Sequence, residues 1–195
     1  MKLDIVFSGV GGQGVVVLSD IYCEAAMLDG FDVAKAEVHG MAQRGGSIVA
    51  YARIGDKVES PLIETGRAGV LVGFEILEAA RALPMLKKEG DVIVNLKYIQ
   101  PSCDFSRVKP KKLEELMRIL KSKAKVHEVD GIGVAEKLGN LLVVNTVLLG
   151  ALSALPEIPV KQEAFQQAIA GRLKEKYVNL NLKAFQLGRE SVRKS

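Results

Sequence analysis

Side chains that commonly hold metals or carry covalent catalysis are scarce in this chain of 195 residues, which has two cysteines, two histidines and no tryptophan. Cys23 and Cys103 are far apart in the sequence, and so are His39 and His127. An iron–sulfur cluster needs four thiolates, and a zinc site needs closely spaced ligands. The sequence therefore predicts no metal site and assigns no catalytic residue.

A glycine-rich segment near the N-terminus is the first candidate binding feature. It fits the pattern G-x-G-x-x-G and lies between an apolar, β-branched run and a helical pattern. In that context glycines allow a tight turn, and the N–H groups at the start of a helix can bind phosphate. The candidate residues are Gly9, Gly11, Gly12, Gln13 and Gly14. A dinucleotide site is one interpretation, but close packing or partner docking is favoured.

The acidic residue that would support a dinucleotide site is poorly placed. Such a site uses an Asp or Glu at the end of the second strand, about 20 residues further on, to bind a ribose. Asp32 comes at the start of the second predicted strand, and Glu37 comes slightly late. The nucleotide interpretation is weakened accordingly.

A second loop, from His39 to Gly46, follows the second predicted strand. Its candidate residues are His39, Gly40, Met41, Gln43, Arg44, Gly45 and Gly46. In a doubly wound sheet it should emerge at the same carboxyl edge as the first loop. We expect a shaped recognition surface there. The alternative is structural, with His39 capping a strand and Arg44 in a salt bridge.

The elements that position these loops alternate along the chain. Strands are predicted at 3–9, 31–38, 47–54, 69–74, 91–95 and 126–129, with 57–60 returning from 47–54 as a hairpin. Helices are predicted at 15–28, 75–83, 111–123, 134–155 with a break at Gly139, 161–176 and 178–191. We therefore expect one α/β domain over residues 1–195. Its sheet should be Rossmann-like and largely parallel (mixed), with an inserted hairpin and a helical C-terminal end.

Charge and hydropathy limit the classes of partner that this chain is expected to bind. The basic segment 107–125 carries a net charge of +6, and 161–195 carries +5. The lysines of 111–123 fall on one helical face, and no interleaved aromatics accompany them, so nucleic acid is not expected. An acidic protein partner for this helix stays open. The longest apolar run, 141–155, is too short and too polar to span a membrane. Few cysteines and no signal-peptide pattern predict a cytoplasmic protein.

Three isolated polar residues are given structural roles. Asn145 lies in an apolar helical run, so its amide is expected to hydrogen-bond a nearby loop. Cys103 has no activating neighbour in the sequence and is expected to be a passive thiol. His127, in a short strand, is expected to be a satisfied histidine of the core or sheet edge.

Together the two loops resemble a known family. The segment G-V-G-G-Q-G from Gly9 and the segment H-G-M-A-Q-R-G-G-S from His39 are similar to the gamma domain of the pyruvate and 2-ketoisovalerate ferredoxin oxidoreductases. The sequence of the second loop resembles that of the beta subunit of indolepyruvate:ferredoxin oxidoreductase in particular. The similarity continues through 135–140, Asn145, 150–151 and 181–188.

This resemblance implies a division of labour between subunits. The holoenzyme would oxidatively decarboxylate an aryl 2-oxo acid with coenzyme A and reduce ferredoxin. Thiamine diphosphate, Mg²⁺ and iron–sulfur clusters would belong to a large alpha subunit, and this chain alone would bind no cofactor. Both glycine loops would face that subunit. The alternative is a free-standing oxidoreductase that binds NAD(P) or FAD through the first loop.

Overall fold

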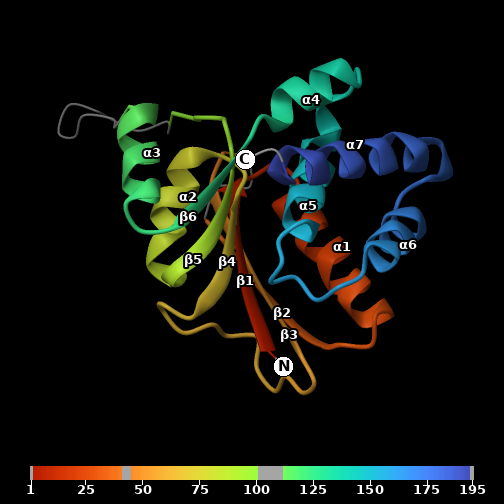
Figure 1. Ribbon diagram of the computed structural model, residues 1–195, viewed down its shortest axis with the longest axis horizontal. Helices are drawn as coiled ribbons and strands as arrows, with labels where there is room; N and C mark the ends of the chain where they lie inside the picture. Colours follow the sequence, from red (N-terminus) through yellow and green to blue (C-terminus); the bar gives the residue numbers. More distant parts are fainter. Residues whose placement is uncertain (1, 41–44, 101–111, 194–195) are drawn as a thin grey trace.

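The protein is described from a computed structural model that covers residues 2–40, 45–100 and 112–193. A six-stranded sheet forms its centre, in the order β2-β3-β1-β4-β5-β6 (Figure 1). The strands are β1 (Lys2–Val10), β2 (Asp32–His39), β3 (Ser47–Gly55), β4 (Ala68–Gly73), β5 (Leu86–Asn95) and β6 (Lys125–Val129). The pairs β1–β4, β4–β5 and β5–β6 are parallel, and β3 is antiparallel to both β1 and β2. The sheet is therefore mixed, as expected.

The sequence of β1 explains its central position. Ile5, Val6 and Phe7 are all fully buried, so side chains on both faces of this strand are covered. A strand buried on both faces is uniformly apolar and does not alternate with polar residues. Ile5 and Phe7 join the larger core, while Val6 joins the core on the opposite face. The strand thus holds the two helical layers together.

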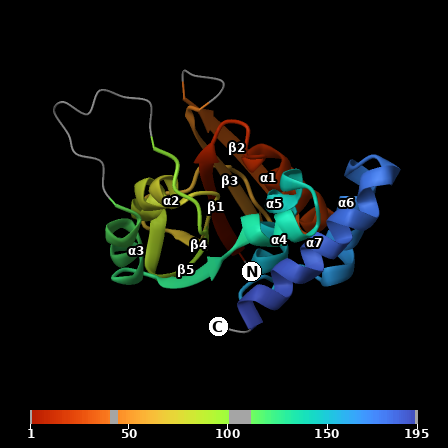
Figure 2. The ribbon, with the colours of Figure 1, turned by 90° about the horizontal axis from the view of Figure 1, so that it is seen from above.

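Helices cover the two faces unequally (Figures 1 and 2). One face carries α1 (Val15–Leu28), α4 (Gly131–Lys137), α5 (Val144–Ser153), α6 (Gln162–Arg172) and α7 (Glu175–Arg193). The other carries α2 (Ile76–Ala82) and α3 (Leu113–Lys121). Three aromatic pairs link β1 to the C-terminal helices, with ring centroids 5.9 Å apart for Phe7–Tyr22, 6.2 Å for Tyr22–Phe165 and 5.7 Å for Phe165–Phe185. The helical C-terminal end is thereby part of the main core.

Glycines allow α5 and α7 to pack backbone against backbone. A Cβ atom added to Gly150 would lie 2.0 Å from the carbonyl oxygen of Phe185. A Cβ added to Gly188 would lie 2.0 Å from the carbonyl oxygen of Val147. Neither distance is sterically possible for any residue with a Cβ. The close crossing of these two helices therefore depends on both glycines.

The hairpin differs from the predicted one. Strand β3 pairs along its whole length with β2 on one side and β1 on the other, so the hairpin is β2–β3 and its turn is the second glycine loop. Residues 57–60, predicted to return as a strand, form none. Both edges of β3 are already occupied, and the Arg53 guanidinium instead binds the carbonyl oxygens of Ser60 and Leu62. Strand β3 also separates β1 from β2, which a simple βαβ opening would place side by side.

Two predicted helices have different bounds in the structure. The predicted helix 134–155 is divided into α4, a 3₁₀ turn at Leu141–Val143 and α5, with Gly139 at φ +74° in the break. The predicted helix 161–176 ends at Arg172. None of the helices in the described residues combines the length and hydropathy needed to cross a lipid bilayer.

Candidate functional site

The two glycine loops lie together at the carboxyl edge of β1. The N–H of Gly11 donates to the carbonyl oxygen of Gly46 at 2.9 Å, which joins the first loop to the second. At the base of the second loop the N–H of Gly40 donates to the carbonyl oxygen of Ser47, also at 2.9 Å. Because β2 runs in the same direction as β1, both strands deliver their loops to one edge. The expected proximity of the two loops is confirmed.

Gln13 closes the first loop from within. Its Oε1 accepts a hydrogen bond from the N–H of Val10 at 2.7 Å, and its Nε2 donates to the carbonyl oxygen of Phe74 at 3.3 Å. A Cβ on Gly9 would lie 2.8 Å from that Oε1, from Val15 and from Phe74. The side chain of Gln13 thus needs the space that Gly9 leaves, and it ties the end of β1 to the end of β4.

The third glycine of the fingerprint packs against a side chain from α5. Gly14 has φ +85°, and a Cβ there would lie 2.9 Å from Nδ2 of Asn145. The Asn145 Oδ1 accepts from the N–H of Thr146 at 2.8 Å, which orients the amide. Asn145 therefore meets the first glycine loop by packing against Gly14, whereas its Oδ1 accepts from Thr146 of its own helix and not, as expected, from the loop. Gly12, at φ +98°, is exposed and has open space around its Cα.

His39 belongs to a series of ion pairs along the edge strand β2. Its Nε2 lies 2.9 Å from Oε2 of Glu37, and Glu37 also accepts from Lys35. The hydrogen bond from Lys35 lowers the pKa of Glu37. Lys35 in turn pairs with Asp20 of α1. Glu37 is thus engaged on the edge strand, with β3 between it and β1.

Three polar residues near this edge escaped the sequence analysis. Glu75 is fully buried and caps α2, where its carboxylate accepts from the N–H groups of Leu77 and Glu78. Burial raises the pKa of Glu75. Glu78, also buried, accepts a hydrogen bond from the Ser47 hydroxyl at the end of the second loop. The contact between Ser47 and Glu78 ties the start of β3, directly after the second loop, to α2.

Asn95, at the carboxyl end of β5, is the third. Its Nδ2 donates to the carbonyl oxygen of Phe74 at 3.1 Å, and its Oδ1 accepts from the N–H of Gly131 at 3.1 Å. The signal that could have identified it is its position, since polar residues at the carboxyl ends of parallel strands meet at one edge. Glu75 lies two residues after the end of β4 and carries the same signal.

Several predicted residues fall outside this account. Met41, Gln43, Arg44 and Cys103 lie outside the described residues. His127 is satisfied as expected, because its Nε2 lies 2.8 Å from Oδ1 of Asp91. Burial raises the pKa of the Cys23 thiol to about 12, so that thiol stays protonated near neutral pH. Within residues 2–40, 45–100 and 112–193, no group of three His, Cys, Asp or Glu side chains is placed to hold a metal ion.

The arrangement creates a switch point in the sheet. The helix after β1 packs on one face, and the helix after the neighbouring parallel strand β4 packs on the other. In open α/β sheets such a point leaves a crevice outside the carboxyl ends of the strands. Here side chains of the chain itself span this point, because Gln13 and Asn95 both donate hydrogen bonds to the carbonyl oxygen of Phe74.

Comparison with known proteins identifies the family. The family model described as pyruvate ferredoxin/flavodoxin oxidoreductase matches residues 4–191. The chain belongs to that family. Within the pyruvate ferredoxin/flavodoxin oxidoreductases, it is 42% identical over 190 residues to "Indolepyruvate oxidoreductase subunit IorB" of Archaeoglobus fulgidus, covering 96% of this chain and 94% of the relative. The resemblance carried by the two loops is confirmed.

Two solved structures of similar fold extend the comparison. The gamma subunit of a keto/oxoacid ferredoxin oxidoreductase from Geobacter sulfurreducens is 28% identical, with a TM-score of 0.76 and 99% of both chains covered. The 2-oxoglutarate:ferredoxin oxidoreductase from Magnetococcus marinus shares the fold, with a TM-score of 0.75 and 18% identity. All of this chain aligns there with 31% of a longer chain. The same fold thus occurs both as a separate chain and as part of a larger one.

Proposed function

We propose that this protein is the small, non-catalytic subunit of a thiamine-diphosphate-dependent 2-oxoacid:ferredoxin oxidoreductase of the indolepyruvate type. The observation that carries the proposal is the similarity over nearly its full length to an indolepyruvate oxidoreductase subunit. The substrate would be an aryl 2-oxo acid such as indolepyruvate. The products would be an acyl-CoA, carbon dioxide and reduced ferredoxin.

The cofactors are assigned to a partner chain. Thiamine diphosphate, Mg²⁺, the iron–sulfur clusters and the coenzyme A site would belong mainly to a large alpha subunit. In support, this chain has only two cysteines, fewer than one cluster needs. The residues of this chain would contribute a rigid edge. That edge packs against the partner and excludes water from the partner's active-site cleft.

The edge that carries the glycine loops is the proposed docking face. Leu141 and Leu142, in the 3₁₀ turn just before Asn145, are 60% and 81% exposed. Val38, at the end of β2, is 57% exposed beside His39. Apolar side chains at the centre and polar groups around them are typical of a stable protein interface. These three residues would be buried by the alpha subunit, with Gly12 allowing its backbone to approach closely.

The free-standing NAD(P) or FAD enzyme is not favoured. In a dinucleotide site the pyrophosphate approaches the glycine turn and the N-terminus of the following helix. Here the side chain of Asn145 packs on Gly14 at that helix N-terminus, and Gln13 fills the turn. The acidic residue of the second strand, Glu37, is bound to Lys35 and His39. These contacts support a structural role for the glycine fingerprint.

Reconstitution with the large subunit tests the proposal. The large subunit, this chain and the purified complex would each be assayed for indolepyruvate-dependent reduction of ferredoxin in the presence of coenzyme A. We expect activity only in the complex. Activity of this chain alone, or a complex that is inactive with all aryl 2-oxo acids, would refute it. Titration of this chain and of its Gly12→Asp variant with NAD(P)H and FAD tests the alternative. We expect no binding at the glycine loops, and therefore no difference in affinity between the two proteins.

A further inference from the structure

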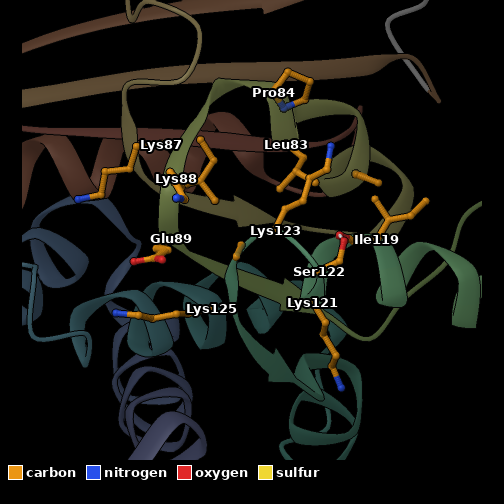
Figure 3. Close-up of a pocket in the computed structure, with 13 residues that line it drawn as sticks. Leu83, Pro84, Lys87, Lys88, Glu89, Ile119, Lys121, Ser122, Lys123 and Lys125 are labelled. Atoms are coloured by element: carbon orange, nitrogen blue, oxygen red, sulfur yellow. Dashed lines mark hydrogen bonds between the residues drawn. The ribbon is translucent and has the colours of Figure 1, made fainter.

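A basic cavity lies at the edge of the sheet opposite the glycine loops. It is bounded by the end of α2, the beginning of β5, and the turn from α3 into β6 (Figure 3). Because β5 and β6 run parallel to β1, their first residues lie at the amino edge. The cavity has a volume of about 880 Å³, within the range of small-molecule sites. It is distinct from the proposed docking face.

The walls of the cavity combine an apolar surface with lysines. Its apolar lining comes from Ala80, Leu83, Pro84, Leu86, Ile119 and Ala124. Five lysines also line it, namely Lys87, Lys88, Lys121, Lys123 and Lys125, beside one carboxylate, Glu89. Such a lining suits a ligand that has an apolar part and several negative charges.

Three of the lysines have no counter-charge in the described part of the chain. Lys121 pairs with Glu128 at 2.6 Å, and Lys87 extends toward Gly69 on a neighbouring surface. Lys88, Lys123 and Lys125 form no ion pair with any described residue and lie around the cavity from β5, the α3–β6 turn and β6 (Figure 3). Lysines on the wall of one cavity that no described carboxylate neutralises give it a positive potential, which favours an anionic ligand.

The backbone of β5 is irregular where it lines the cavity. Leu86 pairs with Ala68 and Asp91 pairs with Val70, so residues 87–90 stand opposite Gly69 alone. Within this bulge Glu89 has φ +59°, a left-handed conformation that is costly for a non-glycine residue. Bulges of this kind redirect side chains at the edges of sheets. Here the bulge carries Lys88 and Glu89 to the cavity.

We propose that this cavity binds a nucleotide-sized anion, with its phosphate groups bound by the exposed ammonium groups of Lys88 and Lys123 and its apolar ring against Leu83, Pro84 and Ile119. Lysine ammonium groups bind phosphates as point charges and need no planar fork. The cavity is larger than an inorganic ion requires, and its apolar lining can bury the faces of a ring. The site is separate from the proposed function and does not depend on it.

Binding to the full-length chain provides the test, with ADP, pyrophosphate and adenosine as probes in isothermal titration calorimetry at low and high salt. We expect ADP to bind, pyrophosphate to bind at least about tenfold more weakly, and adenosine not to bind measurably. Affinity for ADP should fall as salt rises, because exposed charges are screened.

Matched variants locate the site. Lys88→Gln/Lys123→Gln should weaken ADP binding by at least about tenfold, and Glu89→Gln should strengthen it by removing the one carboxylate. Lys174→Gln/Lys183→Gln, which removes the same charge from exposed positions away from the cavity, should leave the affinity unchanged. Circular dichroism would establish that each variant is folded.

Three results would overturn the proposal. The first is absence of measurable ADP binding, and the second is an equal loss of affinity in the control pair. The third is binding of poly-L-glutamate that ADP does not displace, which would identify the surface as a dock for an acidic protein. Retention of ADP binding in Lys88→Gln/Lys123→Gln would place the ligand elsewhere and would also contradict the assignment.

Discussion

Gln13 and Asn95 donate hydrogen bonds to the same acceptor, the carbonyl oxygen of Phe74, at 3.3 Å and 3.1 Å. The three residues come from the carboxyl ends of three neighbouring strands, β1, β4 and β5. A carbonyl oxygen has two lone pairs, and here both neighbouring amides use them. The edge that carries the glycine loops is therefore braced by side chains within the chain itself.

Gln13→Ala should loosen this edge. The substitution leaves the N–H of Val10 without its side-chain acceptor, which costs about 1–3 kcal/mol when such a group is buried. Urea unfolding of the isolated chain measures this loss. Gln186→Ala on α7, where the side chain is exposed and binds Glu190, should change stability by less than about 0.5 kcal/mol. Equal effects of the two substitutions would argue against a bracing role for Gln13.

Two glycine-to-alanine substitutions should change the stability of the fold in opposite directions. Gly150→Ala forces a Cβ against the Phe185 carbonyl and should cost about 3 kcal/mol or more, because the α5–α7 crossing must open. In Gly171→Ala the new Cβ meets only Glu24 Oε1, at 3.6 Å, and α6 gains a better helix former. That variant should be more stable by about 0.5–1 kcal/mol. Thermal unfolding of both variants checks this, and destabilisation by Gly171→Ala would contradict it.

Leu142→Asp should prevent assembly without unfolding the chain. Leu142 is 81% exposed, so a charge there costs little in the isolated chain, but it would be desolvated at the proposed interface. We expect at least about a hundredfold weaker association with the large subunit, measured by calorimetry or co-purification. The control is Leu62→Asp, at a residue 70% exposed in the loop after β3, which should assemble normally. Normal assembly of Leu142→Asp would exclude this face from the interface.

Asp29 should make the fold less stable in acid. Its carboxylate joins the end of α1 to the start of α6, accepting from the N–H of Lys161 at 2.8 Å and from its Nζ at 2.9 Å. These bonds lower the pKa of Asp29 below its ordinary value of 3.8 in the folded protein. The stabilisation is therefore present above that ordinary value and is lost as pH falls through the lower, folded-state pKa.

Comparison with Asp29→Asn isolates this effect. The variant should be less stable than the wild type near neutral pH, and the difference should shrink as the pH falls below the ordinary pKa of the carboxyl. Denaturant unfolding across that acidic range provides the measurement. A difference that stays constant, or that grows in acid, would show that Asp29 does not titrate as its contacts require.

Local sequence determined the strands, most helices and both glycine loops. The apolar run of β1 predicts a buried strand, and the glycines that follow it predict a turn, because both signals depend on a few neighbouring residues. The sequences of the two loops were also sufficient to identify the family. The pattern at 47–54 correctly predicted β3, but nothing local indicated which strands it would pair with.

The tertiary structure decided what those loops do. Insertion of β3 between β1 and β2 moved Glu37 away from the first loop, and the Gly11–Gly46 hydrogen bond joined loops that are separate in sequence. Asn145 reached Gly14 only because α5 packs beside α1. The spacing of neighbouring residues indicates which face of a strand or helix is buried, but not which distant element covers it, so these long-range pairings could not be predicted. The fingerprint is therefore readable as a motif from the sequence, but its use as an internal brace depends on the fold.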